Sequence, residues 1–118
     1  MTPKFKVHTI NNKTITEIQD NTLVIDTPQQ FLELIFNMPS EKIILSKENL
    51  HESFFDLRSG LAGEILQKVS NYTASLGIVG DFSLYESKSL RDFIFESNKS
   101  NRVVFVGTVE DALNRLSQ

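Results

Sequence analysis

Residues 59–80 read SGLAGEILQKVSNYTASLGIVG, and this stretch decides the fold. Its first half separates apolar from polar residues at helical spacing. The apolar face consists of Leu61, Ile65, Leu66 and Val69, and the polar face of Glu64, Gln67, Lys68 and Asn71. Residues 74–79 are mostly apolar, which is typical of a short strand buried on both faces. The stretch therefore predicts a helix from Ser59-Gly60 to about Tyr72, followed by a buried strand that Gly80-Asp81 closes.

The same alternation of helix and buried strand recurs on both sides of this stretch. Capping residues and apolar stripes predict further helices over 28–38, from Ser87 or Ser89, and from Thr108 onward. Short apolar runs predict further strands over 43–45 and 103–106. Strands that alternate with helices indicate a parallel sheet with right-handed crossovers and helices packed against it.

The N-terminal part of the chain has a different pattern. Residues 4–10 alternate apolar and polar side chains with a period of two, and residues 13–18 return after Asn11-Asn12. Asparagine tolerates positive φ, so a tight antiparallel hairpin is expected there, and residues 23–25 are a short extension. We predict a single α/β domain over residues 1–118, with four helices and a mixed, mostly parallel sheet of five to six strands.

Composition excludes several classes of function. The 118 residues contain no Cys and carry a formal net charge of −3. Disulfides, thiolate metal sites and a Cys nucleophile are therefore ruled out, and the acidity gives no reason to expect nucleic acid. No apolar run is long enough to span a bilayer. We expect a cytoplasmic protein with no metal, no cofactor and no catalytic residues, because the His residues, hydroxyls and carboxylates share no catalytic spacing.

Candidate binding residues gather where the parallel strands end. Ligands and partners of such sheets usually bind beyond the carboxyl ends of the strands. Here those ends are Ser46-Lys47, residues 80–83 and Gly107-Thr108, and the Arg58-Ser59-Gly60 turn is expected beside them. Phe54 and Phe55 precede this turn; at least one is expected in the core, whereas an exposed one would suit a protein partner.

Ser59 has two interpretations. At a helix N-terminus, a phosphate on its hydroxyl would lie in the favourable field of the helix, with Arg58 nearby. The simpler interpretation is that Ser59 only caps the helix.

The remaining candidates are Asp81, Ser83, Lys88 and Arg91. The first two suit a ligand site or a plain turn. Lys88 and Arg91 suit an anion or an acidic partner, or else a solvated helix face.

The segment FFDLRSGLAGEILQKV resembles part of the STAS domains, the anti-sigma-factor antagonists and their relatives. In that family an Asp-Ser-Ser-Gly-Leu motif begins the second long helix, and a partner kinase phosphorylates its serine. Ser59-Gly60-Leu61 matches the end of the motif, while Arg58 stands where the family has a serine and the acid is Asp56. The resemblance implies a STAS-like fold over nearly the whole chain and a regulatory serine at Ser59.

The segments KFKVHTINNKTI, FFDLRSGLAGEILQK, LGIVGDFSLYESKSLRDFIFESN and VVFVGTVEDAL resemble a bacterial family, domain of unknown function 4180. This resemblance covers nearly the full length. It implies a bacterial origin and carries no activity with it.

Two functions from different classes follow from these residues. The first is a non-enzymatic regulatory or protein-interaction module, which Ser59 phosphorylation would switch. The alternative is a protein that binds a small anionic ligand or nucleotide, or a weak enzyme, using the crevice at the carboxyl ends of the strands. A homodimer through the edge strand 4–10 is a further expectation.

Overall fold

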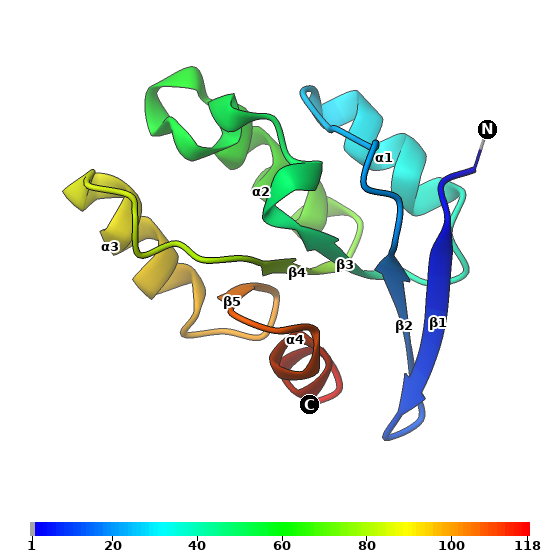
Figure 1. Cartoon of the computed structure of the whole chain (residues 1–118). Helices are drawn as coiled ribbons and strands as arrows, with labels where there is room; N and C mark the ends of the chain where they lie inside the picture. The colour runs from blue at the N-terminus through cyan, green and yellow to red at the C-terminus, as the bar shows by residue number, and fades with distance from the viewer. Residues whose placement is uncertain (1) are drawn as a thin grey trace.

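A computed structural model describes residues 2–118, which form a five-stranded sheet in the order β1-β2-β3-β4-β5 (Figure 1). The strands are β1 (Phe5–Ile10), β2 (Lys13–Ile18), β3 (Lys42–Ser46), β4 (Ser75–Val79) and β5 (Val103–Val106). The helices are α1 (Pro28–Phe36), α2 (Leu61–Asn71), α3 (Lys88–Ser97) and α4 (Val109–Leu116). β1 pairs with β2 antiparallel, and the pairs from β2 to β5 are parallel. The predicted mixed α/β fold is confirmed.

Local sequence explains where the hairpin turns and where helices begin. Asn11 and Asn12 have φ values of 51° and 63°, the left-handed conformation that a two-residue hairpin turn needs. Thr27 caps α1 in a capping box with Gln30, and Pro28 occupies the first helical turn. The helix that was expected from Ser87 or Ser89 is capped by Ser87, whose hydroxyl oxygen accepts from the Leu90 amide.

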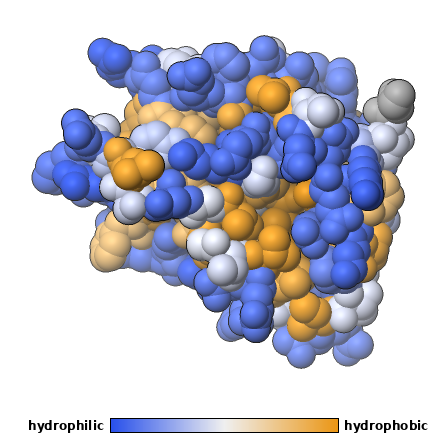
Figure 2. Space-filling model, in the orientation of Figure 1, coloured by the Kyte–Doolittle hydropathy of each residue, from blue (hydrophilic) through white to orange (hydrophobic). Residues whose placement is uncertain are grey.

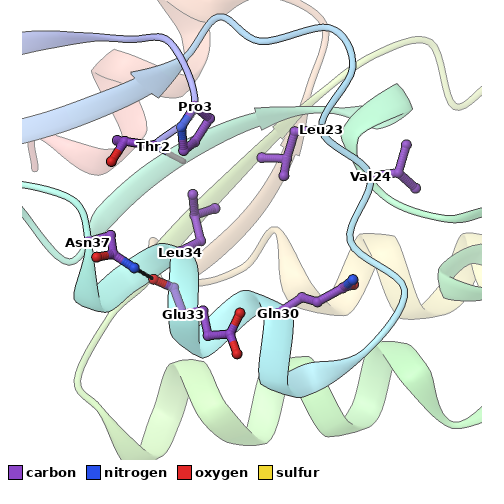
Figure 3. A pocket seen from close by; sticks show the side chains of 8 residues that line it. All are labelled: Thr2, Pro3, Leu23, Val24, Gln30, Glu33, Leu34 and Asn37. Atoms are coloured by element: carbon purple, nitrogen blue, oxygen red, sulfur yellow. Dashed lines mark hydrogen bonds between the residues drawn. The ribbon is translucent and has the colours of Figure 1, made fainter.

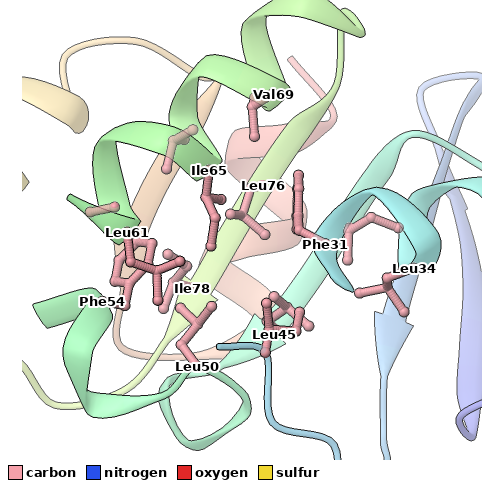
Figure 4. Close-up of a cluster of buried hydrophobic side chains, with 14 of the residues drawn as sticks. Phe31, Leu34, Leu45, Leu50, Phe54, Leu61, Ile65, Val69, Leu76 and Ile78 are labelled. Carbon is pink, nitrogen blue, oxygen red and sulfur yellow. The ribbon is translucent and has the colours of Figure 1, made fainter. Parts of the chain in front are cut away.

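The two faces of the sheet carry unequal layers. The larger hydrophobic cluster lies between the sheet and α1, α2 and α3, and Figure 4 shows its side chains pointing into the space between helices and strands. Phe31, Ile65 and Leu76 are completely buried in it. On the other face α4 packs alone, and Ala112 and Leu116 form a smaller cluster with residues of the sheet. The central strands are thus covered on both faces, as their composition predicts.

The connection from β3 to α2 is more ordered than its polar sequence suggests. It contains three short 3₁₀ turns: η1 (Lys47–Asn49), η2 (Glu52–Phe55) and η3 (Leu57–Ser59). Asn49 is buried, and its amide group donates to the carbonyls of Asp20 and Leu23 while its oxygen accepts from Ser46. This side chain satisfies buried backbone groups and holds the connection against the end of β2.

Two boundary predictions were wrong. Residues 23–25 do not form a strand: only Ile25 makes an isolated parallel bridge, with Leu50. The helix expected from Ser59-Gly60 begins at Leu61 with Gly60 as its N-cap, because η3 occupies Leu57–Ser59 and Gly60 turns the chain with a φ of 82°. Ser59 therefore lies one residue outside the cap position.

Among the described residues, none of the helices has the length and apolar character needed to cross a membrane.

Candidate functional site

The candidate site lies at the carboxyl ends of β3 and β4. There the 3₁₀ turns η1 to η3 follow β3, and residues 80–87 lead from β4 to α3 (Figure 1). Aromatic contacts join the two segments. The Phe55 ring stacks on Tyr85 with centroids 5.1 Å apart, and it lies 6.1 Å from the Phe82 ring. The segment that carries Arg58 and Ser59 therefore shares one aromatic cluster with the loop that carries Asp81 and Ser83.

The Ser59 side chain is exposed and makes two hydrogen bonds, one within the 3₁₀ segment and one to the first residue of α2. Its Oγ donates to the Ser53 carbonyl at 2.5 Å and accepts from the Leu61 amide at 3.2 Å. The first bond connects η3 back to η2. The hydroxyl thus acts as a latch between these two elements, and it also bonds to the first amide of α2.

Arg58 forms an ion pair with Asp56. Its Nε donates to Asp56 Oδ1 at 3.1 Å, and 92% of the Arg58 side chain is exposed. The Arg58 side chain and backbone amide both donate to the Asp56 carboxylate, and these hydrogen bonds hold the pKa of Asp56 below its usual range. The guanidinium is therefore accessible to solvent and is held only by a surface carboxylate.

Asp81 and Ser83 come together in a local turn. Asp81 Oδ1 accepts from the Ser83 hydroxyl at 2.6 Å and from the Ser83 amide at 3.0 Å. The pKa of Asp81 is lowered, chiefly by the Ser83 hydroxyl, then by the Ser83 amide, with a smaller contribution from the charge of Lys47. This geometry matches the turn interpretation of Gly80-Asp81-Phe82-Ser83.

Phe54 and Phe55 both belong to the core. They are 0% and 8% exposed, so the expectation of at least one core residue is met by both. Neither ring is free to act as an exposed contact for a partner.

Lys47 also belongs to the site, although its sequence position predicts only the end of a strand. Its Nζ lies 4.9 Å from the centroid of the Tyr85 ring and 3.4 Å from the Asp81 carbonyl. The stem of Lys47 crosses Gly80, where an added Cβ would lie 2.7 Å from Lys47 Cβ. Gly80 therefore allows the lysine to reach the loop. In the sequence, the position of Lys47 directly after β3 was the feature that could have marked it as a site residue.

Lys88 and Arg91 lie on the exposed side of α3. Lys88 Nζ pairs with Asp92 at 2.7 Å in the i, i+4 geometry of a surface helix pair. Arg91 is exposed. Both positions fit the solvated-face interpretation.

A hollow of about 380 Å³ also lies at the carboxyl ends of the strands, where Figure 2 shows apolar side chains gathered between strand ends and α4. Its lining residues include Lys4, Glu17, Ser46, Val79 and Val109. The crevice that the alternative function needs, with Asp81, Lys88 and Arg91 in its wall, is not this hollow.

Another hollow, of about 340 Å³, lies between the N-terminal segment, residues 23–24 and α1 (Figure 3). Glu33 and Gln30 lie along its helical wall, and the Asn37 side chain donates to the Glu33 carbonyl at 2.7 Å. Within residues 2–118 there is no cluster of three or more His, Asp or Glu side chains that would hold a metal ion.

The sequence profile of a family described as "Domain of unknown function (DUF4180)" matches residues 10–116. No curated protein matches the chain.

Proposed function

The chain belongs to the DUF4180 family, whose description gives no activity, and we propose from the candidate site that it is a non-enzymatic regulatory module. In this proposal a protein partner contacts the surface around Arg58, Ser59 and Gly60, together with the loop of Asp81 and Ser83. Phosphorylation of Ser59 switches the contact. The protein acts in the bacterial cytoplasm, which its lack of Cys suits.

The observation that carries the proposal is the latch formed by the Ser59 hydroxyl. A phosphorylated serine oxygen has no proton, so the bond from Ser59 Oγ to the Ser53 carbonyl must break on modification. Ser53 directly precedes the buried pair Phe54 and Phe55. The modification would therefore disturb a segment that is anchored in the core and stacked on the 82–85 loop.

Charge around Ser59 adds a second effect. A phosphate brings about two negative charges to a position next to the Asp56–Arg58 ion pair. The exposed guanidinium can leave a surface carboxylate at little cost, because solvent and salt screen the attraction between exposed charges. Phosphorylation would then pair Arg58 with phosphate and leave Asp56 unpaired, so the local net charge that a partner meets changes from zero to about −2.

The resemblance of Ser59-Gly60-Leu61 to the STAS motif supports the choice of this serine and of a kinase as its modifier. Arg58 and Asp56 differ from that motif, so the recognising surface of the partner must differ as well.

The test combines mass spectrometry with partner capture. We expect a phosphorylated fraction at Ser59 in protein from its native cells. Ser59→Asp should bind the partner about tenfold or more weakly than wild type, since charge at an interface commonly costs over 1.4 kcal/mol. Ser59→Ala also removes the bond to the Ser53 carbonyl but adds no charge, so it should weaken binding by less than Ser59→Asp does.

Ser70→Asp is the matched control. Ser70 is an exposed serine near the C-terminal end of α2, so this variant adds the same charge away from the site. Unmodified Ser59 in native cells, together with unchanged partner binding by Ser59→Asp, would contradict the proposal.

A further inference from the structure

The two edges of the sheet differ. At the β5 edge, side chains bond to the backbone groups that face away from the sheet, and we call this edge closed. The Asn98 side chain accepts from the Phe105 amide at 2.7 Å and donates to the Phe105 carbonyl at 3.0 Å, as a neighbouring strand would. The Ser97 hydroxyl donates to the Val103 carbonyl at 2.6 Å. Side chains at the end of α3 therefore occupy the groups through which β5 would pair with another strand.

The β1 edge is open. The Gln19 amide donates to the Lys4 carbonyl at 2.8 Å, and these two residues lie directly opposite in the register of the hairpin. In an antiparallel pair, the backbone N–H and C=O groups of one residue bond to the neighbouring strand, and those of the next residue point away from it. Lys4, Lys6 and His8 thus bond toward β2.

The backbone N–H and C=O groups of Phe5, Val7 and Thr9 consequently point away from the sheet. Within residues 2–118, the hydrogen bonds found outside strands and helices include none to these groups. The Val7 side chain is 44% exposed in the middle of this edge.

We propose that β1 is a homodimerisation strand, which pairs antiparallel with β1 of a second copy about a two-fold axis at Val7. This register places Val7 opposite Val7, and Phe5 opposite Thr9. Every outward group of the three residues then meets a complementary group of the other copy. The exposed Val7 side chains come together across the axis, where apolar cross-strand pairs stabilise a sheet.

The charges of the strand fit the same arrangement. Lys6 of one copy lies opposite His8 of the other, and the His8 Nε2 is already bonded to Glu17 Oε1 at 2.8 Å. Lys4 lies opposite Ile10, so no two lysines face each other. Because β5 is closed by Asn98, pairing through β1 ends at a dimer and does not continue into a filament.

The test is the oligomeric state of the full chain by light scattering and sedimentation, from about 10 μM to about 1 mM, the range that a small interface requires. We expect a concentration-dependent dimer. Val7→Lys places two ammonium groups opposite each other at the axis and should weaken the dimer by about tenfold or more.

Phe95→Lys is the matched control, because Phe95 is an exposed apolar residue on α3 at the closed edge of the sheet. It should leave the dimer unchanged, and circular dichroism will establish that both variants are folded. A monomer at every concentration, or equal weakening by both variants, overturns the proposal.

A second measurement uses the absence of Cys in the chain. Val7→Cys should be joined to a second copy by a short bis-maleimide reagent, and Phe95→Cys should not. Equal cross-linking of the two variants overturns the proposed register.

Discussion

At the scale of single residues, two asparagine side chains bond to backbone groups and so connect separate segments of the chain. Asn49 joins Asp20 and Leu23 to the start of η1, and Asn98 takes the place of a strand beside Phe105. Both asparagines bond to residues seven or more positions away. Their roles depend on distant parts of the chain, so composition and periodicity could not reveal them.

The carboxylate of Asp81 gives a prediction at this scale. Its folded-state pKa lies below the unfolded value of about 3.9, because Ser83 donates to the charged form. Its contribution to stability is therefore present above about pH 4 and is lost as the pH falls through the folded-state pKa. A titration followed by carboxyl ¹³C chemical shifts should show a midpoint for Asp81 below about 3.9.

Ser83→Ala removes the hydroxyl donor and should raise that midpoint. Thr22→Ala is the control: Thr22 donates to Asp20 at 2.6 Å and also lowers the pKa of Asp20. It should raise the Asp20 midpoint alone. An Asp81 midpoint that does not respond to Ser83→Ala would refute the assignment of the shift to this hydrogen bond.

At the scale of elements, the conformation of Gly60 explains why α2 begins at Leu61 and not at Ser59. Capping preferences favoured Ser59 as the N-cap, but η3 uses Asp56 as its own cap and ends at Ser59. Gly60 adopts a φ of 82° between the two elements, which side chains other than glycine rarely adopt. The conformation of Gly60, and not the propensity of Ser59, sets where α2 begins.

Two glycine substitutions, one at the N-cap of α2 and one inside the helix, should therefore have opposite effects on stability. Gly60→Ala forces a side chain into the left-handed region and should lower the free energy of unfolding by about 1 kcal/mol. Gly63→Ala lies within the helix with open space around the new methyl group, and should raise it by about 0.5–1 kcal/mol. Denaturant unfolding measures both, and a stabilising Gly60→Ala would show that the left-handed turn is not required.

At the scale of the whole molecule, the sheet carries a thick layer on one face and α4 alone on the other. α4 approaches β4 closely because Gly77 has no side chain. A Cβ there would lie 3.1 Å from Ala112 Cβ and 3.5 Å from Leu116 Cδ1. This glycine is a strand position where the close approach of a helix requires it.

Gly77→Val should push α4 away from the sheet and lower the free energy of unfolding by about 1–3 kcal/mol. Amide exchange in α4 should accelerate more than exchange in α2, which packs on the opposite face. Gly107→Ala, where nothing lies within 4 Å of the new Cβ, is the control and should change little. Equal acceleration in both helices would contradict an independent α4 layer.

Much of the candidate site could be placed from the sequence, because Lys47 and Asp81 follow the ends of β3 and β4 and Ser59 lies at the turn before α2. The sequence could not show that the segments carrying these residues lie next to each other. Phe55 joins the two segments through contacts with Phe82 and Tyr85, and such contacts leave no periodic signal in the chain.

The sequence by itself determined the alternation of strands and helices, the hairpin at Asn11-Asn12 and the mixed α/β class, because hydrophobic periodicity and local turn chemistry act over a few neighbouring residues. Only the tertiary structure decided that Ser59 bonds to Ser53, that Phe54 and Phe55 are both buried, and that β5 is closed while β1 is open. These features depend on the packing of segments distant in the chain, where burial and hydrogen bonding select among conformations that local preferences leave nearly equal in energy.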